Sequence, residues 1–175
     1  LIWHIMKTYS HYGYNDFLLA GGYKLDVIKN YFAKNNKDGF KIKVVDTGLQ
    51  SLTGERVRRL APLIKGDFAL TYGDGVANLN IQELANFHQE KKVLGTITGV
   101  HPRHRFGLVY VDHNSLITGF QQKPILSDVV NGGFMVFSKK VLKLIKKDSM
   151  IEDLFFPLMR QGKLALYPHK GFWFA

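Results

Sequence analysis

Residues 68–75 read Phe-Ala-Leu-Thr-Tyr-Gly-Asp-Gly, an apolar run that stops at two glycines flanking an aspartate. We expect a strand over 67–72 that places Asp74 at its carboxyl end, where open α/β sheets bind their ligands. The glycines would let the backbone approach a phosphate closely, and Mg²⁺ prefers a carboxylate together with phosphate oxygens. The alternative is a glycine-rich turn in which Asp74 caps the next helix.

Strand and helix patterns alternate on both sides of this stretch, up to residue 100. Helical spacing covers the residues up to Tyr12, then 24–33, 53–64 and 81–91, whereas strand patterns cover 16–20, 40–46, 67–72 and 93–100. Alternation with short connections favours an α/β fold, with a mixed, mostly parallel sheet and helices on both faces.

The pattern changes beyond residue 100. Two strands over 108–112 and 116–121, joined by the turn 113–115, predict a hairpin. A strand over 133–138, helices near 139–146 and over 151–161, and a last strand over 163–167 follow. No linker-like segment or internal repeat interrupts the chain, so we predict a single domain over residues 1–175.

The composition is that of a soluble globular protein, with 46% apolar and 22% charged residues in 175. The sequence contains no cysteine, which excludes disulfides, thiolate metal sites and cysteine nucleophiles. No segment reaches the roughly 18–20 apolar residues of a membrane span. We therefore expect no membrane partner and a cytoplasmic location.

The net charge of +10 favours anionic partners. The basic residues are scattered, apart from one lysine cluster over 139–147 whose intervening residues are apolar. We interpret that cluster as the solvated face of a helix. Charge alone leaves nucleic acid, anionic lipid and small phosphates open as partners; the motifs described below favour small phosphates and no nucleic acid.

Residues 46–56 carry hydroxyls, glycines and one arginine between an expected strand and an expected helix. The free N–H groups at a helix start can hold an anion, and Arg56 in the first turn could bind a phosphate through two donors. The alternative is a capped helix with Thr53 as N-cap, and with Arg56, Arg58 and Arg59 in solvent.

Two later segments could also contact a sugar phosphate. Lys123 follows an expected strand, and Pro124 fixes the exit of the chain; the alternative is an exposed lysine at a strand end. Asn131 precedes an expected buried strand and could bind a hydroxyl, or could form a plain turn. His101 and His104 have no acidic third ligand nearby, so a metal site there is not favoured.

Taken in order, these segments resemble the sugar-1-phosphate nucleotidyltransferases, and within them the branch that uses CTP and glucose 1-phosphate. Each motif alone is modest, but nine in the family's order are specific and span nearly the whole chain. The matching segments are residues 2–10, 22–24, 45–48, 53–56, 71–75, 105–107, 120–124, 131–134 and 171–173.

The resemblance implies a Rossmann-like nucleotide-diphospho-sugar transferase fold. It also implies transfer of a cytidylyl group to glucose 1-phosphate with Mg²⁺, giving CDP-glucose and pyrophosphate, as in the biosynthesis of cell-surface polysaccharides such as O-antigen. A homo-oligomer is expected for the full-length protein. The implied roles are catalysis for Asp74 and Lys123, metal binding for Asp74, nucleotide binding for Ser51, Arg56 and Gly73, and sugar binding for Gly107, Gln122, Asn131 and Gly132.

The sequence departs from the family pattern in four places. The family's glycine-rich loop would precede Leu1, and its second metal-binding aspartate would follow Ala175, so we expect a domain incomplete at both ends and little activity from these 175 residues alone. Gln122 stands where the family has glutamate, and the segment between Phe32 and Val45 is short. A different base (dTTP, UTP or ATP) and a non-catalytic sugar-nucleotide binder are the alternatives.

Overall fold

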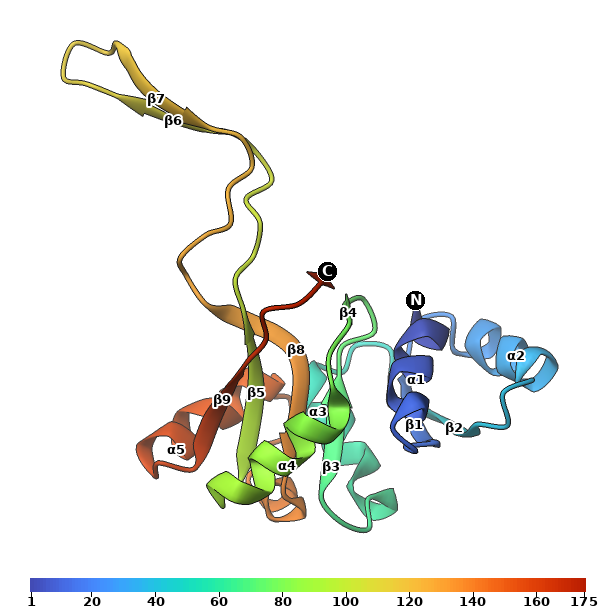
Figure 1. Cartoon of the computed structure of the whole chain (residues 1–175). Helices are drawn as coiled ribbons and strands as arrows, with labels where there is room; N and C mark the ends of the chain where they lie inside the picture. Colours follow the sequence, from blue (N-terminus) through green and yellow to red (C-terminus); the bar gives the residue numbers. More distant parts are fainter.

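The computed structural model describes residues 1–175, and its first half alternates helices and strands (Figure 1). The first helix shows why: Ile2, Ile5, Met6 and Tyr9 recur at helical spacing and form one apolar face. The elements are α1 (Ile2–His11), β1 (Asp16–Gly21), α2 (Leu25–Asn35), β2 (Lys41–Asp46), α3 (Thr53–Leu60), the 3₁₀ turn η1 (Ala61–Leu63) and β3 (Phe68–Thr71).

The second half contains a long hairpin and a lysine-rich 3₁₀ turn. The elements are β4 (Val76–Ala77), α4 (Ile81–Lys91), β5 (Gly95–Val100), β6 (Leu108–Val111), β7 (Ile117–Gln121), β8 (Val130–Phe137), η2 (Lys139–Lys143), η3 (Ile151–Leu154), α5 (Phe155–Arg160), β9 (Leu164–Pro168) and β10 (Trp173–Phe174). No helix combines the length and the apolar character needed to cross a membrane.

The main sheet has the strand order β3-β8-β5-β9. β8 runs antiparallel to both β3 and β5, whereas β5 and β9 are parallel. Three of its four strands therefore point the same way. β1 and β2 form a separate parallel pair, and β4 pairs with β10. The predicted mixed α/β sheet is thus confirmed, with β8 as the strand that runs against the others.

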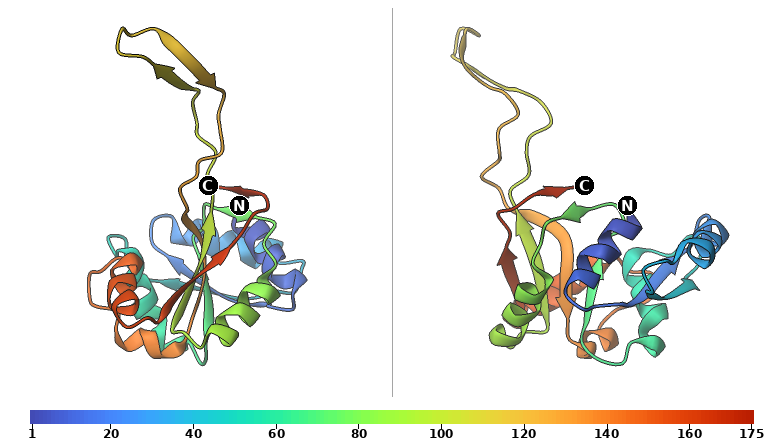
Figure 2. Two further views of the ribbon diagram at one scale, coloured as in Figure 1. Left: turned by 60° about the vertical axis from the view of Figure 1, so that its left-hand side comes forward. Right: turned by 45° about the vertical axis from the view of Figure 1, so that its right-hand side comes forward.

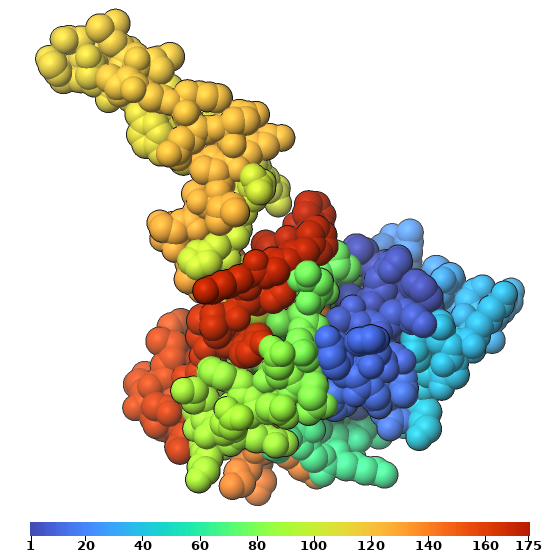
Figure 3. Space-filling model, viewed as in Figure 1, coloured from blue at the N-terminus to red at the C-terminus, as the bar shows by residue number.

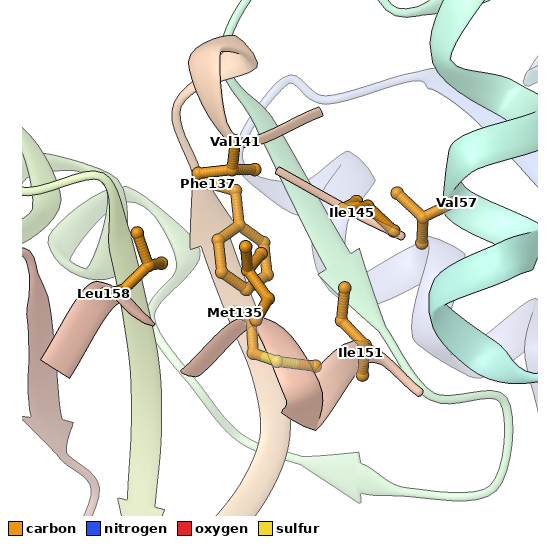
Figure 4. Close-up of a cluster of buried hydrophobic side chains, with 8 residues drawn as sticks. Val57, Met135, Phe137, Val141, Ile145, Ile151 and Leu158 are labelled. Atoms are coloured by element: carbon orange, nitrogen blue, oxygen red, sulfur yellow. The ribbon is translucent and has the colours of Figure 1, made fainter. Parts of the chain in front are cut away.

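The core lies on both faces of β8. Phe134 and Val136 pack with α1 and α4, whereas Met135 and Phe137 pack on the opposite face with α3, η2, η3 and α5. Figure 4 shows Phe137 and Met135 among the side chains of the second group. A strand buried on both faces needs a continuous apolar run, which the sequence of β8 supplies. The prediction of helices on both faces is therefore confirmed.

The β6–β7 hairpin projects away from this body as an arm (Figures 1 and 2). Two irregular segments connect it to β5 and β8, and an isolated bridge between Arg103 and Ile125 joins them. Its apolar side chains remain exposed, among them Ile117 and Phe120 at 71% and 61%. The arm therefore contributes little to the packed core.

Local details differ from the sequence expectations at two helices. The helix expected near 139–146 is the short 3₁₀ turn η2, although Val141 and Ile145 are buried and the lysines exposed as expected. Thr53 does not cap α3: Leu52 occupies that position, and the Thr53 hydroxyl accepts a bond from the Ile151 N–H at 3.0 Å. A contact from a distant segment has replaced the local cap.

Candidate functional site

Asp74 lies where the sequence predicts, just beyond the carboxyl end of β3, in a hollow of about 240 Å³. The amino end of β8 forms another wall, which brings Asn131 and Gly132 beside Asp74. The Trp173 indole N–H donates to the Gly132 carbonyl at 2.8 Å and closes one side. Three of the expected site residues, from two distant segments, thus share one cavity.

The Asp74 carboxylate is exposed and has no side-chain or backbone partner in the structure. It does not cap the following helix, because Asn80 fills that role by accepting a bond from the Glu83 N–H at 3.1 Å. β4 separates the two positions. The structural alternative for Asp74 is therefore wrong, and the carboxylate is available to a ligand.

Gly73 leaves open space beside this carboxylate. A Cβ built on Gly73 would meet only the Ile2 side chain, at 3.9 Å. Gly73 is exposed, so a ligand could reach its backbone without displacing any packed group. The contact of Gly73 with a nucleotide stays a prediction.

Tyr72 fixes the strand end that carries Gly73 and Asp74. Its hydroxyl donates to Glu152 of η3, a partner that no sequence pattern predicts. Burial, and then the neighbouring Glu152, raise the pKa of Tyr72 above its usual range, so the phenol stays neutral and keeps donating. The Glu152 contact therefore attaches the turn at Gly73 and Asp74 to η3.

Arg56 is held by backbone and hydroxyl acceptors rather than standing free. One terminal nitrogen donates to the Gly21 carbonyl at 3.1 Å and to the Thr47 hydroxyl at 2.8 Å. The other donates to the Leu49 carbonyl at 3.3 Å. Thr47 is fully buried and donates to the same Gly21 carbonyl at 2.7 Å. Arg56 therefore joins the carboxyl ends of β1 and β2 to α3.

Ser51 lies in the same loop, and its hydroxyl is close to Gly48. Arg56 and Gly73 both line a larger cavity of about 660 Å³ between β1 and β3. The expected nucleotide-binding residues Arg56 and Gly73 thus border one cavity, whereas Asp74 opens into the smaller hollow.

Glu55 is a buried charge that sequence reasoning missed. It is fully buried and accepts bonds from Arg58 at 2.6 Å and from Arg59 at 2.8 Å. These two guanidinium groups lower the pKa of Glu55 to about 2. Arg58 and Arg59 are exposed, as the alternative interpretation expected, but each also binds the buried Glu55. The spacing of three and four residues along one helix was the available signal for these pairs.

The remaining expected residues, Gly107, Gln122 and Lys123, lie at the base of the arm, next to the ends of β6 and β7. Figure 3 shows that the arm stands away from the body of the molecule. Gly107 and Gln122 are neighbours there, because a Cβ on Gly107 would come within 3.0 Å of the Gln122 amide oxygen. Lys123 is exposed and has a positive φ of 47°, and its carbonyl accepts a bond from Arg103 at 3.2 Å. The structure therefore groups these three residues with one another but not with Asp74.

No group of three or more histidine or acidic side chains comes together in the structure. Asp74 offers one carboxylate. This single carboxylate fits a Mg²⁺ ion whose other ligands are mostly oxygens of the substrate phosphates. Mg²⁺ in such sites usually has one or two protein carboxylates and several other oxygen ligands.

Comparison with known proteins agrees with this geometry. The family model described as nucleotidyl transferase matches residues 1–174. A Bacillus subtilis protein named "probable glucose-1-phosphate cytidylyltransferase" is 37% identical over 199 aligned positions, which cover 100% of this chain and 78% of the relative. The glucose-1-phosphate cytidylyltransferase of Salmonella typhi is 35% identical, covering 99% and 77%.

Solved structures support the fold. HddC from Yersinia pseudotuberculosis superposes with a TM-score of 0.70 at 20% identity, covering 98% of this chain and 77% of that one. Its complex with GMP-PN gives a TM-score of 0.72 at 19% identity, covering 99% and 78%. The chain belongs to the nucleotidyl transferase family.

Proposed function

We propose that this protein transfers a cytidylyl group from CTP to glucose 1-phosphate, giving CDP-glucose and pyrophosphate. The observation that carries the proposal is the unpaired Asp74 carboxylate at the end of β3, in a hollow shared with Asn131 and Gly132. The names of the relatives at 35–37% identity supply the choice of base and sugar.

The reaction needs positioning and charge neutralisation more than covalent chemistry. An oxygen of the sugar phosphate attacks the α-phosphorus of CTP in line, a new P–O bond forms, and the bond to the β-phosphate oxygen breaks. The leaving pyrophosphate takes the electron pair. No enzyme nucleophile takes part, which is compatible with a chain that has no cysteine. Holding the two anions in line is the main task of the protein.

In this proposal Asp74 would hold Mg²⁺ together with the triphosphate oxygens, and the ion would neutralise charge that develops on the phosphates. Gly73 would lie against the nucleotide, and Ser51 and Arg56 would border it. Arg56 already donates three hydrogen bonds, so its main contribution would be to shape the loop that meets the nucleotide.

The sugar side of the proposal depends on the arm. Gln122 and Gly107 would bind sugar hydroxyls, and Lys123 would meet the sugar phosphate. The two irregular connections beside Arg103 and Ile125 are the segments that could bring the arm toward Asp74. Because Gln122 is neutral, we expect weaker binding of the sugar than a carboxylate at that position would give.

The test measures pyrophosphate release by the full-length protein, because we expect little activity from these 175 residues alone. The assay contains CTP, glucose 1-phosphate and Mg²⁺, and each component is then omitted in turn. Release is expected only with all three present. Asp74→Asn should abolish it, whereas Asp26→Asn, an exposed aspartate on α2, should not change it. Competition among the four common triphosphates identifies the base, and no release with any of them would refute the proposal.

A second candidate function is binding of a sugar nucleotide without turnover. The separation between the arm residues and Asp74 favours it. Calorimetric binding of CDP-glucose, without pyrophosphate release under any condition, would support this candidate against catalysis.

A further inference from the structure

A lysine-rich surface follows β8, and the proposed reaction does not use it. The Lys139 ammonium donates to the Lys65 carbonyl at 3.2 Å, so a second segment adds a lysine to those of residues 139–147. Two segments far apart in sequence therefore build one basic surface, which we call the lysine face. Its members, all exposed, are Lys65, Lys139, Lys140, Lys143, Lys146 and Lys147.

The core fixes the backbone that carries the lysine face. Val141 and Ile145 lie between the lysines in sequence and are buried, at 0% and 8% exposed, in the same cluster as Phe137. The Asp67 carboxylate also accepts a bond from the Lys139 N–H at 3.0 Å. Packing and this hydrogen bond therefore hold the segment in place while its lysine side chains point into solvent.

The positive charge of the lysine face is largely unpaired. Among its lysines only Lys147 has a carboxylate partner, the exposed Asp148 at 3.8 Å. Residues 65–67 and 139–148 together contain six lysines and two aspartates, which leaves a net charge of +4. Such a surface attracts an anionic partner. It also repels a second copy of itself, because a symmetric dimer would place the same charges opposite one another.

The lysine face lies at the end of the body opposite the Asp74 hollow. β8 connects the two places: Asn131 near its start lines the hollow, and η2 follows its last residue, Phe137. An extended strand over 131–137 spans roughly 20 Å. Figure 1 shows the orange segment after β8 on the side of the body away from β4 and the arm. A partner bound there leaves both the hollow and the arm open.

The chemistry of the lysine face fits a broad negative surface better than a single phosphate. All its cations are lysines, and an ammonium group acts as a point charge without the fork that lets arginine hold one phosphate through two bonds. Leu144 within the segment and Met150 just after it are also exposed, at 41% and 47%. An anionic membrane offers headgroup phosphates with an apolar layer beneath them, whereas the backbone of nucleic acid offers phosphates alone.

We propose that the lysine face binds the surface of anionic phospholipid membranes. The expectation of no membrane partner rests on the lack of a spanning segment, whereas a peripheral contact needs none. The lysine ammonium groups lie among the headgroup phosphates, and Leu144 reaches toward the acyl chains. Because the face is remote from the Asp74 hollow, this binding does not depend on the proposed catalysis.

The test measures co-sedimentation of the full chain with vesicles of phosphatidylcholine, alone or mixed with phosphatidylglycerol. We expect binding only to the mixed vesicles, with an affinity that falls as salt is added. The variant combines Lys140→Gln, Lys143→Gln and Lys146→Gln. Each lysine near an anionic surface strengthens binding about fivefold, so this variant should bind roughly 100-fold more weakly.

The matched control removes the same charge elsewhere, through Lys29→Gln, Lys34→Gln and Lys37→Gln, which are exposed positions on and just after α2. This control should keep most of its vesicle binding. Both variants should keep the urea midpoint of the unchanged chain, because exposed side chains contribute little to folding. Leu144→Gln should weaken vesicle binding several-fold, since it removes the apolar contact with the acyl layer.

Three results would overturn the proposal. Equal binding to vesicles of phosphatidylcholine alone would show that charge does not drive it, and an equal loss in the two triple variants would show that this face is not the one that binds. Displacement from the vesicles by random-sequence duplex DNA at the same phosphate concentration, with no effect of Leu144→Gln, would identify the face as a nucleic-acid site instead.

Discussion

Arg56 provides the sharpest test of how the candidate nucleotide site is built. Its guanidinium donates three hydrogen bonds, to Gly21, Thr47 and Leu49. A hydrogen bond of this kind contributes about 1 kcal/mol net, and the one to Leu49 is exposed. Arg56→Ala should therefore lower the free energy of unfolding by about 2–3 kcal/mol. For a chain of this size that corresponds to a fall in Tm of about 5–10 °C.

The assay is urea unfolding, with the midpoint as readout and an unchanged slope as the sign of two-state behaviour. Arg160→Ala is the matched control, because Arg160 is exposed and has no partner. Arg56→Lys keeps the charge but should recover little, since one ammonium cannot span the same acceptors. If Arg56→Ala stays within about 0.5 kcal/mol of the control, Arg56 is not a structural clamp and the argument fails.

Three other predictions concern stability. Glu55 has a pKa of about 2, well below its usual 4.5, so stability should be intact above pH 4.5 and fall as the pH drops toward 2; Glu55→Gln should remove that dependence in urea midpoints. Burial lowers the pKa of His88 below its usual 6.5, so the free energy of unfolding should also fall as the pH drops below 6.5. In His88→Gln this loss, measured by urea midpoints, should be smaller. Phe137→Ala should cost about 3–5 kcal/mol in urea unfolding, whereas Phe172→Ala, at an exposed position, should cost almost nothing.

Local sequence patterns were sufficient to predict an element wherever the residues of that segment alone determine its structure. α4 spans Ile81–Lys91, as predicted, because its apolar spacing follows a capping asparagine. β4 and β10 were missed: their two-residue ladder joins residues far apart in sequence, and no local pattern marks such a pair. β8 begins three residues earlier than expected, at Val130, because pairing with β5 extends it.

The candidate site shows the same division. The position of Asp74 at a strand end follows from local sequence alone, and the structure confirms it. The partner of Tyr72 could not be predicted, because Glu152 comes from a turn eighty residues later. The local sequence around Glu55 predicts an exposed helical residue. In the structure Glu55 is buried, and the segment at Asp148 contacts it through a backbone N–H. Long-range packing therefore decides which charges are structural and which stay free for a ligand.

The division between body and arm gives these residues different physical roles. Arg56, Tyr72 and Glu55 are bound into the packed body, so changing them disturbs the frame that holds Asp74. Gln122 and Lys123 are exposed on an arm that adds little to the core. Substitutions there should leave stability nearly unchanged, because exposed side chains without partners contribute little to folding. A loss of sugar binding without a loss of stability would therefore identify the arm as the part of the molecule that recognises the sugar.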